Sequence, residues 1–234
     1  MGESLVVWVT GASSGLGHAL VRYLLCNGHR VAASVRLDTP ATPATAFPDH
    51  QDLPNLLQLP GQLTDAQAAL EASAAIEARW GGLNLCILNT GTCDYLPADV
   101  TANTLFANLV QTNWQAARHV LEAATPLLVK ARKPLVLGLF SQASAAQQGD
   151  PTLPLCGSNS LAQWFREQRQ PLQAQGIALS LIAPSSIKLP VFGKPLPPGE
   201  WTADKAAHRI VETLPGRHPE LVLEALNMDA LWPL

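Results

Sequence analysis

The sequence has few charged residues and no concentration of positive charge. Charged residues make up 14% of the 234 residues, and 15 Lys and Arg against 18 Asp and Glu give a formal net charge of −3. A nucleic-acid backbone attracts proteins through a basic surface field, which this composition does not supply. Apolar runs stay well short of the ~18 residues that suggest a membrane span. Neither nucleic acid nor a membrane is therefore an expected partner.

Cysteine is also scarce, and the cysteines are not paired along the chain. The four are Cys26, Cys86, Cys93 and Cys156, with no C-x-x-C pair among them. The first residues lack the basic-then-apolar pattern of a secretory leader. We therefore expect reduced thiols in a cytoplasmic protein and no metal site.

Apolar residues, in contrast, are plentiful and follow a regular pattern. Hydrophobic residues make up 47% of the chain, enough for one α/β domain over residues 1–234. Short apolar runs rich in β-branched residues alternate with segments of helical apolar spacing. Because parallel strands need crossover connections, this alternation predicts a parallel sheet with helices on both faces. The expected strands are 5–9, 31–35, 56–59, 83–89, 134–140, 177–183 and 221–226, and the expected helices are 16–27, 64–80, 101–130, 157–173 and 202–213.

Two local signals refine this prediction. TDAQ at 64–67 is a capping-box pattern, which predicts the start of a helix at Thr64. The segment 37–54 has prolines at 40, 43, 48 and 54, each of which removes a backbone donor, so we expect an exposed loop there.

A glycine-rich turn, TGASSGLG at 10–17, directly follows the first strand and opens the first helix. The pyrophosphate of a dinucleotide needs backbone N–H groups at a positively polarised helix end, and glycine lets the backbone approach closely. This turn therefore predicts a phosphate-binding site. His18, next to it, has two interpretations: a phosphate contact or an exposed surface histidine.

TGASSGLG resembles the T-G-x-x-x-G-x-G turn of the short-chain dehydrogenase/reductase family. Asn89-Thr90-Gly91 is similar to the N-A-G that ends the family's fourth strand, and the segment 176–187 resembles its sixth strand and following turn. Asn113 resembles the helix asparagine of the family's catalytic tetrad, and Ser141 resembles the residue that closes its fifth strand; both are candidate catalytic residues. The similarity covers about residues 3–190.

The resemblance implies a doubly wound Rossmann domain with a parallel sheet of about seven strands. It also implies a nicotinamide dinucleotide as cofactor and a small molecule as ligand or substrate. The cofactor-binding positions carried over are Gly11, Ser13, Ser14, Gly15, Leu16, Gly17, Asn89 and Gly91.

The end of the second strand bears on the choice of nucleotide. A carboxylate there would bind a free ribose 2′-hydroxyl, whereas a cation favours a 2′-phosphate. The sequence has Arg36 and no acid at this point, so we expect NADP(H) rather than NAD(H). Gln62 stands where the family often has an aspartate against the adenine, and an amide can serve the same role. A chain that binds neither nucleotide stays an open alternative.

The tyrosine and lysine on which the family's chemistry depends are absent. In the Y-x-A-S-K frame, LCGSN places Leu155 at the tyrosine and Asn159 at the lysine. Leucine has no proton to give, and asparagine carries no charge to stabilise a phenolate, although its amide can still bind a ribose hydroxyl. The chain has two tyrosines, Tyr23 and Tyr95, neither between Ser141 and the sixth predicted strand, so no shift of register restores the pair.

Three hypotheses follow. The favoured one is a family member that binds NADP(H), lacks ordinary dehydrogenase activity, and has a binding, regulatory or partner role. The second is an NADP(H)-dependent oxidoreductase in which Ser141, a water or Tyr95, with Asn113 nearby, replaces the missing donor. The third is a non-redox enzyme, such as a cyclase, isomerase or lyase.

The resemblance also implies a homo-oligomer, a dimer or tetramer. The helices at 101–130 and 157–173 are those with which relatives pair. Trp114, Trp164 and Phe165 are candidates for the contact, and burial in the core is the competing explanation.

Overall fold

The computed structural model describes residues 4–35, 47, 53–89, 102–140, 160–184 and 202–223. Within this part, side chains are described except at 102–111, 183–184 and 222–223.

The strands form one parallel sheet in the order β3-β2-β1-β4-β5-β6-β7. Their bounds are β1 Val6–Val9, β2 Arg30–Val35, β3 Leu56–Pro60, β4 Leu85–Asn89, β5 Leu135–Leu139, β6 Ala178–Pro184 and β7 Glu220–Leu223. The strand order reverses between β1 and β4, and at such a switch point the carboxyl ends of the strands leave a crevice for ligands. The predicted seven-stranded parallel sheet is confirmed.

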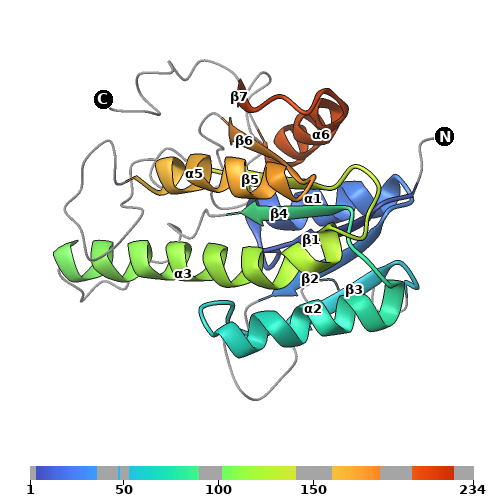
Figure 1. The fold of residues 1–234 in the computed structure, drawn as a ribbon, viewed down its shortest axis with the longest axis horizontal. Coiled ribbons are helices and arrows are strands. Elements are labelled where there is room, and N and C mark those ends of the chain that lie inside the picture. Colours follow the sequence, from blue (N-terminus) through green and yellow to red (C-terminus); the bar gives the residue numbers. More distant parts are fainter. Residues whose placement is uncertain are drawn as a thin grey trace, which may run out of the picture.

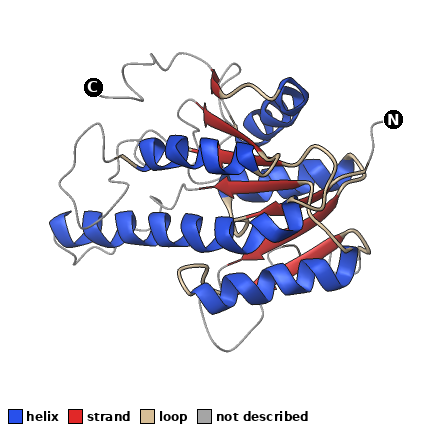
Figure 2. Cartoon of the chain, viewed as in Figure 1, coloured by secondary structure: helices blue, strands red, loops and turns tan. Residues whose placement is uncertain are grey.

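Helices cover both faces of this sheet (Figure 1). They are α1 Gly15–Cys26, α2 Ala66–Trp80, α3 Ala102–Leu128, α5 Leu161–Ala174 and α6 Ala203–Thr213, with a short 3₁₀ turn, η3, at Leu214–Gly216. Buried side chains of α2, α3 and α5 form one core layer with the sheet, and those of α1 and α6 form the other. Figure 2 shows the two helical layers on either side of the strands.

Two predicted helix starts are wrong by a few residues. The N-cap of α2 is Asp65, whose carboxylate accepts from the Gln67 backbone N–H, and not Thr64 of the capping-box pattern. Helix α5 begins at Leu161, four residues later than expected, because Ser160 is extended and its hydroxyl caps Gln163. In both cases the N-cap is a polar residue that lies further along the chain than the predicted start of the helix.

The aromatic residue in the central strand binds its neighbour through a buried hydrogen bond. Trp8 of β1 is fully buried, and its Nε1–H donates to Ser34 Oγ of β2 at 2.8 Å. A buried indole N–H without a partner would lose its hydrogen bond to water and gain nothing in return. Ser34 therefore makes a large tryptophan acceptable in the middle of the sheet.

The composition of the proline-rich segment 37–54 predicts an exposed loop, and this prediction is wrong for one of its residues. Its one described residue before Leu53, Phe47, is 2% exposed and packs into the core on the α1 side of the sheet. Burial of an aromatic side chain removes a large apolar surface from water, which favours this placement.

The predicted contact aromatics divide between core and surface. Phe165 is fully buried, so core packing explains it, while Trp114 and Trp164 are partly buried against the same core. Pairing of copies through α3 and α5 stays a prediction. In the part of the chain that the structure describes, no helix is both long and apolar enough to span a bilayer.

An ion cluster joins α5 to the edge strand β7. Arg166 binds both carboxylate oxygens of Glu220, at 2.9 and 3.1 Å, and Arg169 donates to the Pro219 carbonyl at 3.1 Å. The hydrogen bond from Arg166 holds the pKa of Glu220 below its ordinary value. A two-point contact of this kind fixes orientation as well as distance.

Removing the acceptor of the Trp8 indole is expected to destabilise the protein. Ser34→Ala leaves a buried N–H unpaired and should lower the free energy of unfolding by about 1–3 kcal/mol. Urea denaturation followed by tryptophan fluorescence measures this change. Ser4→Ala removes an exposed hydroxyl whose hydrogen bond to Gly28 O has the same length, 2.8 Å, and should change stability by less than about 0.5 kcal/mol. Equal effects of the two variants would contradict the role of Ser34.

Stability should also fall in mild acid because of His29. Its Nδ1 accepts from the Leu5 backbone N–H at 3.2 Å, and partial burial lowers its pKa from 6.5. Below pH 6.5 the unfolded chain therefore binds a proton that the folded chain resists, so stability decreases from there down to the folded pKa. His29→Gln, which stays neutral, should flatten the dependence of the unfolding free energy on pH between 7 and 5. A His29→Gln protein with the wild-type slope would contradict the assignment.

Candidate functional site

The glycine-rich turn connects β1 to α1 at the switch point of the sheet. Ala12 N–H donates to the Ser34 carbonyl of β2 at 3.0 Å, and Thr10 N–H donates to Ile87 O of β4 at 3.0 Å. The turn is therefore tied to both neighbours of β1. Its position at the carboxyl edge is the one that the sequence predicted.

Two glycines in the turn have backbone angles that other residues rarely adopt. Gly11 has φ +61° and Gly15 has φ +56°. A third, Gly17, is needed for space, since a Cβ on it would lie 2.1 Å from the Gly11 carbonyl oxygen and 2.9 Å from Asn89 Nδ2. Without side chains at these positions, α1 begins directly against the end of β1.

Asn89 completes the turn from the end of β4. Its Nδ2 donates to Gly11 O at 3.3 Å, and its backbone N–H donates to Thr10 Oγ1 at 3.0 Å. The Thr10 hydroxyl in turn donates to Ile87 O at 3.3 Å. The predicted site residues Gly11 and Asn89 are thus hydrogen-bonded to each other, and Gly17 lies directly against both.

The start of α1 fits the phosphates of a dinucleotide. The first helical hydrogen bond runs from His18 N–H to Ser14 O, so the N–H groups of residues 15 to 17 precede it. Ser14 is the exposed N-cap, and its hydroxyl makes no capping bond. Among the residues that the structure describes, no group lies within 4 Å of the place where a Cβ of Gly15 would stand, which leaves room for a ligand above the helix end. Free donors, a positive dipole end and open space are what a pyrophosphate requires.

The structure also describes four other predicted residues, Gln62, Asn113, Ser13 and Leu16. Gln62 is exposed directly after β3, and its backbone carbonyl accepts from Asp65 N–H at 2.9 Å. Asn113 is 3% exposed in α3. Ser13 is exposed, and Leu16 packs partly against the core. Arg36, Gly91, Tyr95, Ser141 and Asn159, with Leu155, lie outside the described residues.

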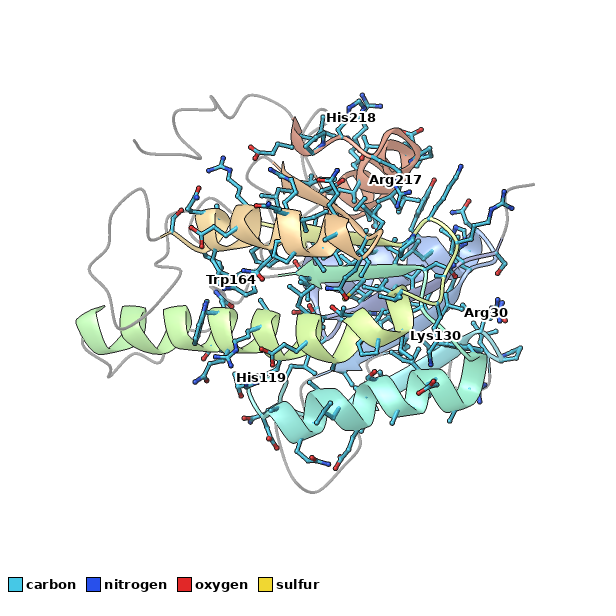
Figure 3. All side chains as sticks on the ribbon, in the orientation of Figure 1. Arg30, His119, Lys130, Trp164, Arg217 and His218 are labelled. Atoms are coloured by element: carbon cyan, nitrogen blue, oxygen red, sulfur yellow. The ribbon has the colours of Figure 1, made fainter. Side chains whose placement is uncertain are left out.

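The structure excludes Tyr23 as a proton donor for this site. It lies in α1 eight residues beyond Gly15, roughly 12 Å along the helix, with its ring 5.1 Å from that of His208 in α6. The described lysines cannot replace the family's catalytic lysine at this site either. Lys130 and Lys133 lie just before β5, at the edge where the strands begin, and Lys205 is exposed on α6 (Figure 3 labels Lys130). Groups of three or more potential metal ligands are also absent from the described residues.

Sequence reasoning missed contacts that support the turn. The Ser34 carbonyl accepts from Ala12 N–H, the Thr10 hydroxyl accepts from Asn89 N–H, and Phe47 stacks on His18. The sequence did contain a signal that Phe47 is buried, because it is the one Phe, Tyr or Trp in the polar, proline-rich segment 37–54.

A methyl group at Gly17 is expected to disrupt the turn. Gly17→Ala places its Cβ against the backbone of Gly11, which cannot move without breaking the contact with Asn89, so we expect a loss of about 1–3 kcal/mol of stability. Gly82→Ala is the control, because the nearest atom to its Cβ is 4.0 Å away. Thermal and urea unfolding of the two variants measure the difference. A Gly17→Ala protein as stable as Gly82→Ala would contradict the close approach.

Comparison with known proteins agrees with this geometry. The family model for short chain dehydrogenase matches residues 5–197. A 3-amino-tetrahydro-pyrrolizinone reductase of Xenorhabdus hominickii is 28% identical over 211 residues, which are 86% of this chain and 68% of the relative.

Solved structures show the same fold. A short chain dehydrogenase from Burkholderia cenocepacia in complex with NADP has a TM-score of 0.71 at 21% identity, over 95% of this chain and 89% of that one. An apo short chain oxidoreductase from Pseudomonas aeruginosa, described as containing an atypical catalytic center, has a TM-score of 0.72 at 18% identity, over 96% and 97% of the two chains. With the family model matching most of its length, this chain belongs to the short-chain dehydrogenase family.

Proposed function

We propose that this protein is an NADP(H)-binding member of its family without ordinary dehydrogenase activity, in a binding, regulatory or partner role. The observation that carries the proposal is the contrast between a complete phosphate cradle and the lack of a tyrosine and lysine in the frame 155–159. The Gly11–Gly17–Asn89 unit has the geometry that phosphate binding requires. Tyr23, one of the two tyrosines of the chain, lies away from it.

The chain's own groups account for nucleotide binding in this proposal. Backbone N–H groups at the start of α1, with the Ser14 hydroxyl, would hold the pyrophosphate. Arg36 favours NADP(H) over NAD(H), Gln62 is placed after β3 for the adenine, and Asn159 would bind a ribose hydroxyl. The Burkholderia relative binds NADP on the same fold, which supports this choice.

The chemical step is where the proposal departs from the family. A bound NADPH would supply hydride to a carbonyl carbon. The developing alkoxide then needs a proton, and general acid help is typically worth ~10²–10⁴-fold in rate. Leu155 cannot give one, and Asn159 offers no positive charge to ease ionisation of a phenol. The atypical centre of the Pseudomonas relative supports the view that this fold persists when its usual active site changes.

Two experiments test the proposal. The first is calorimetric titration with NADPH and NADH, and the second is a screen of carbonyl compounds for NADPH oxidation. We expect NADPH to bind, with no turnover by the wild-type protein. Gly15→Asp, whose side chain tolerates a positive φ and places a negative charge in the open space above the helix end, should abolish binding while circular dichroism confirms the fold. The double variant Leu155→Tyr with Asn159→Lys should raise NADPH oxidation by ~10²–10⁴-fold over the background.

Several outcomes would contradict it. Failure of both nucleotides to bind would remove the cofactor role. Wild-type turnover that is lost in Tyr95→Phe or Ser141→Ala would instead identify a substitute donor. Conversion of a substrate without any nicotinamide would favour a non-redox enzyme.

A further inference from the structure

Ser180 of β6 carries a buried hydroxyl group in an apolar face of the sheet. The residue is 4% exposed, and its Oγ has no hydrogen-bond partner in the part of the chain that the structure describes. Leu137 of β5 lies opposite it in register, and Ile182 follows on the same face two positions along β6. A buried hydroxyl without a partner has lost its hydrogen bonds to water, which costs free energy. The serine therefore needs a partner that the neighbouring side chains do not supply.

This hydroxyl lines a small cavity between the sheet and the end of the last helix. The cavity has a volume of about 10 Å³. Its walls come from β5, β6 and β7 on one side, and from Thr213, η3 and His218 on the other. A buried water molecule needs roughly 10–15 Å³ of such space. The cavity is thus of the size of a single water and too small for an organic ligand.

Two of the lining residues can complete the hydrogen bonds of a water at Ser180. The Thr213 hydroxyl donates to the Ile210 carbonyl at 2.7 Å, so its oxygen keeps a lone pair with which it can accept from a water. His218 has a ring nitrogen that accepts and one that donates when it is neutral. A buried water typically makes about three hydrogen bonds. Ser180, Thr213 and His218 together offer a set of that size.

The outer wall of the cavity is held in place by the residues beside His218. A Cβ on Gly216 would lie 2.6 Å from His218 Nε2, so the imidazole packs directly against the glycine. Arg217, between them, has φ +47°, and its guanidinium donates to the Lys133 carbonyl at 2.9 Å (Figure 3 labels Arg217 and His218). The connection from η3 to β7 is therefore attached to the residues that precede β5.

We propose that this cavity is the binding site of one ordered water molecule, which hydrogen-bonds to Ser180 Oγ and connects β6 to the segment 213–218 through Thr213 and His218. The water gives the buried serine its missing partner. It also adds a polar link between the central sheet and the elements that follow α6, where the packing is otherwise apolar. The inference does not depend on nucleotide binding and stands or falls separately from the proposed function.

A high-resolution crystal structure of the wild-type protein tests the site directly. We expect a peak of electron density for one water within hydrogen-bond distance of Ser180 Oγ and of a second polar group of the cavity. A cavity without such a peak would refute the proposal.

The stability of Ser180→Ala gives an independent test, because the two possibilities predict opposite signs. If a water is bound, alanine removes one of its partners, and the melting temperature should fall by about 2–4 °C, the shift expected for one net hydrogen bond in a chain of this size. If the hydroxyl is unpaired, alanine removes a buried polar group that has no partner, and the melting temperature should stay the same or rise. Either of these last two results would overturn the proposal.

A second buried serine provides the matched control. Ser73 of α2 is 8% exposed, and its hydroxyl donates to the Ala123 carbonyl at 2.7 Å, so its partner belongs to the protein. Crystals of Ser73→Ala should keep the water peak beside Ser180, whereas crystals of Ser180→Ala should lose it. A peak that is unchanged in Ser180→Ala would show that the serine does not hold the water, and would refute the assignment.

Discussion

The close contact between the start of α1 and the turn that precedes it is the constraint on which the site depends. Gly17 can lie against the Gly11 carbonyl because neither residue has a side chain. This contact lets the helix begin where β1 ends, so its positive end faces the carboxyl edge of the sheet at the switch point. Thr10 and Asn89 then connect the turn to β4, and Ala12 connects it to β2. The turn is therefore hydrogen-bonded to both strands that flank β1.

The proposed function treats nucleotide binding and chemistry as separable. Phosphate recognition would depend on backbone N–H groups and on the lack of side chains in the glycine-rich turn. Proton delivery in the family depends instead on side chains that would stand at positions 155 and 159. Members of one fold family can therefore differ in the reaction they support.

Side-chain contacts at the borders of the sheet complete the structure. On the β2 and β3 side, Phe47 fills the core from a segment whose composition predicts only a loop. On the opposite side, Arg166 and Arg169 of α5 fix the edge strand β7 through Glu220 and the Pro219 carbonyl. Both are contacts between segments far apart in the chain. Neither could be assigned from local pattern, since each depends on which elements become neighbours.

The sequence by itself determined the alternation of strands and helices, the parallel sheet and the position of the glycine-rich turn. These follow from local periodicity, from short apolar runs and from the few residues that tight turns accept. It also shows leucine at position 155 and asparagine at position 159, the residue identities on which the proposed loss of dehydrogenase activity rests. Only the tertiary structure decided that Asp65 and Ser160 cap their helices, that Ser34 satisfies the indole of Trp8, and that Phe47 stacks on His18. Caps shift by a residue at little cost in free energy, and contacts across the sheet form only when the strand order brings their residues together.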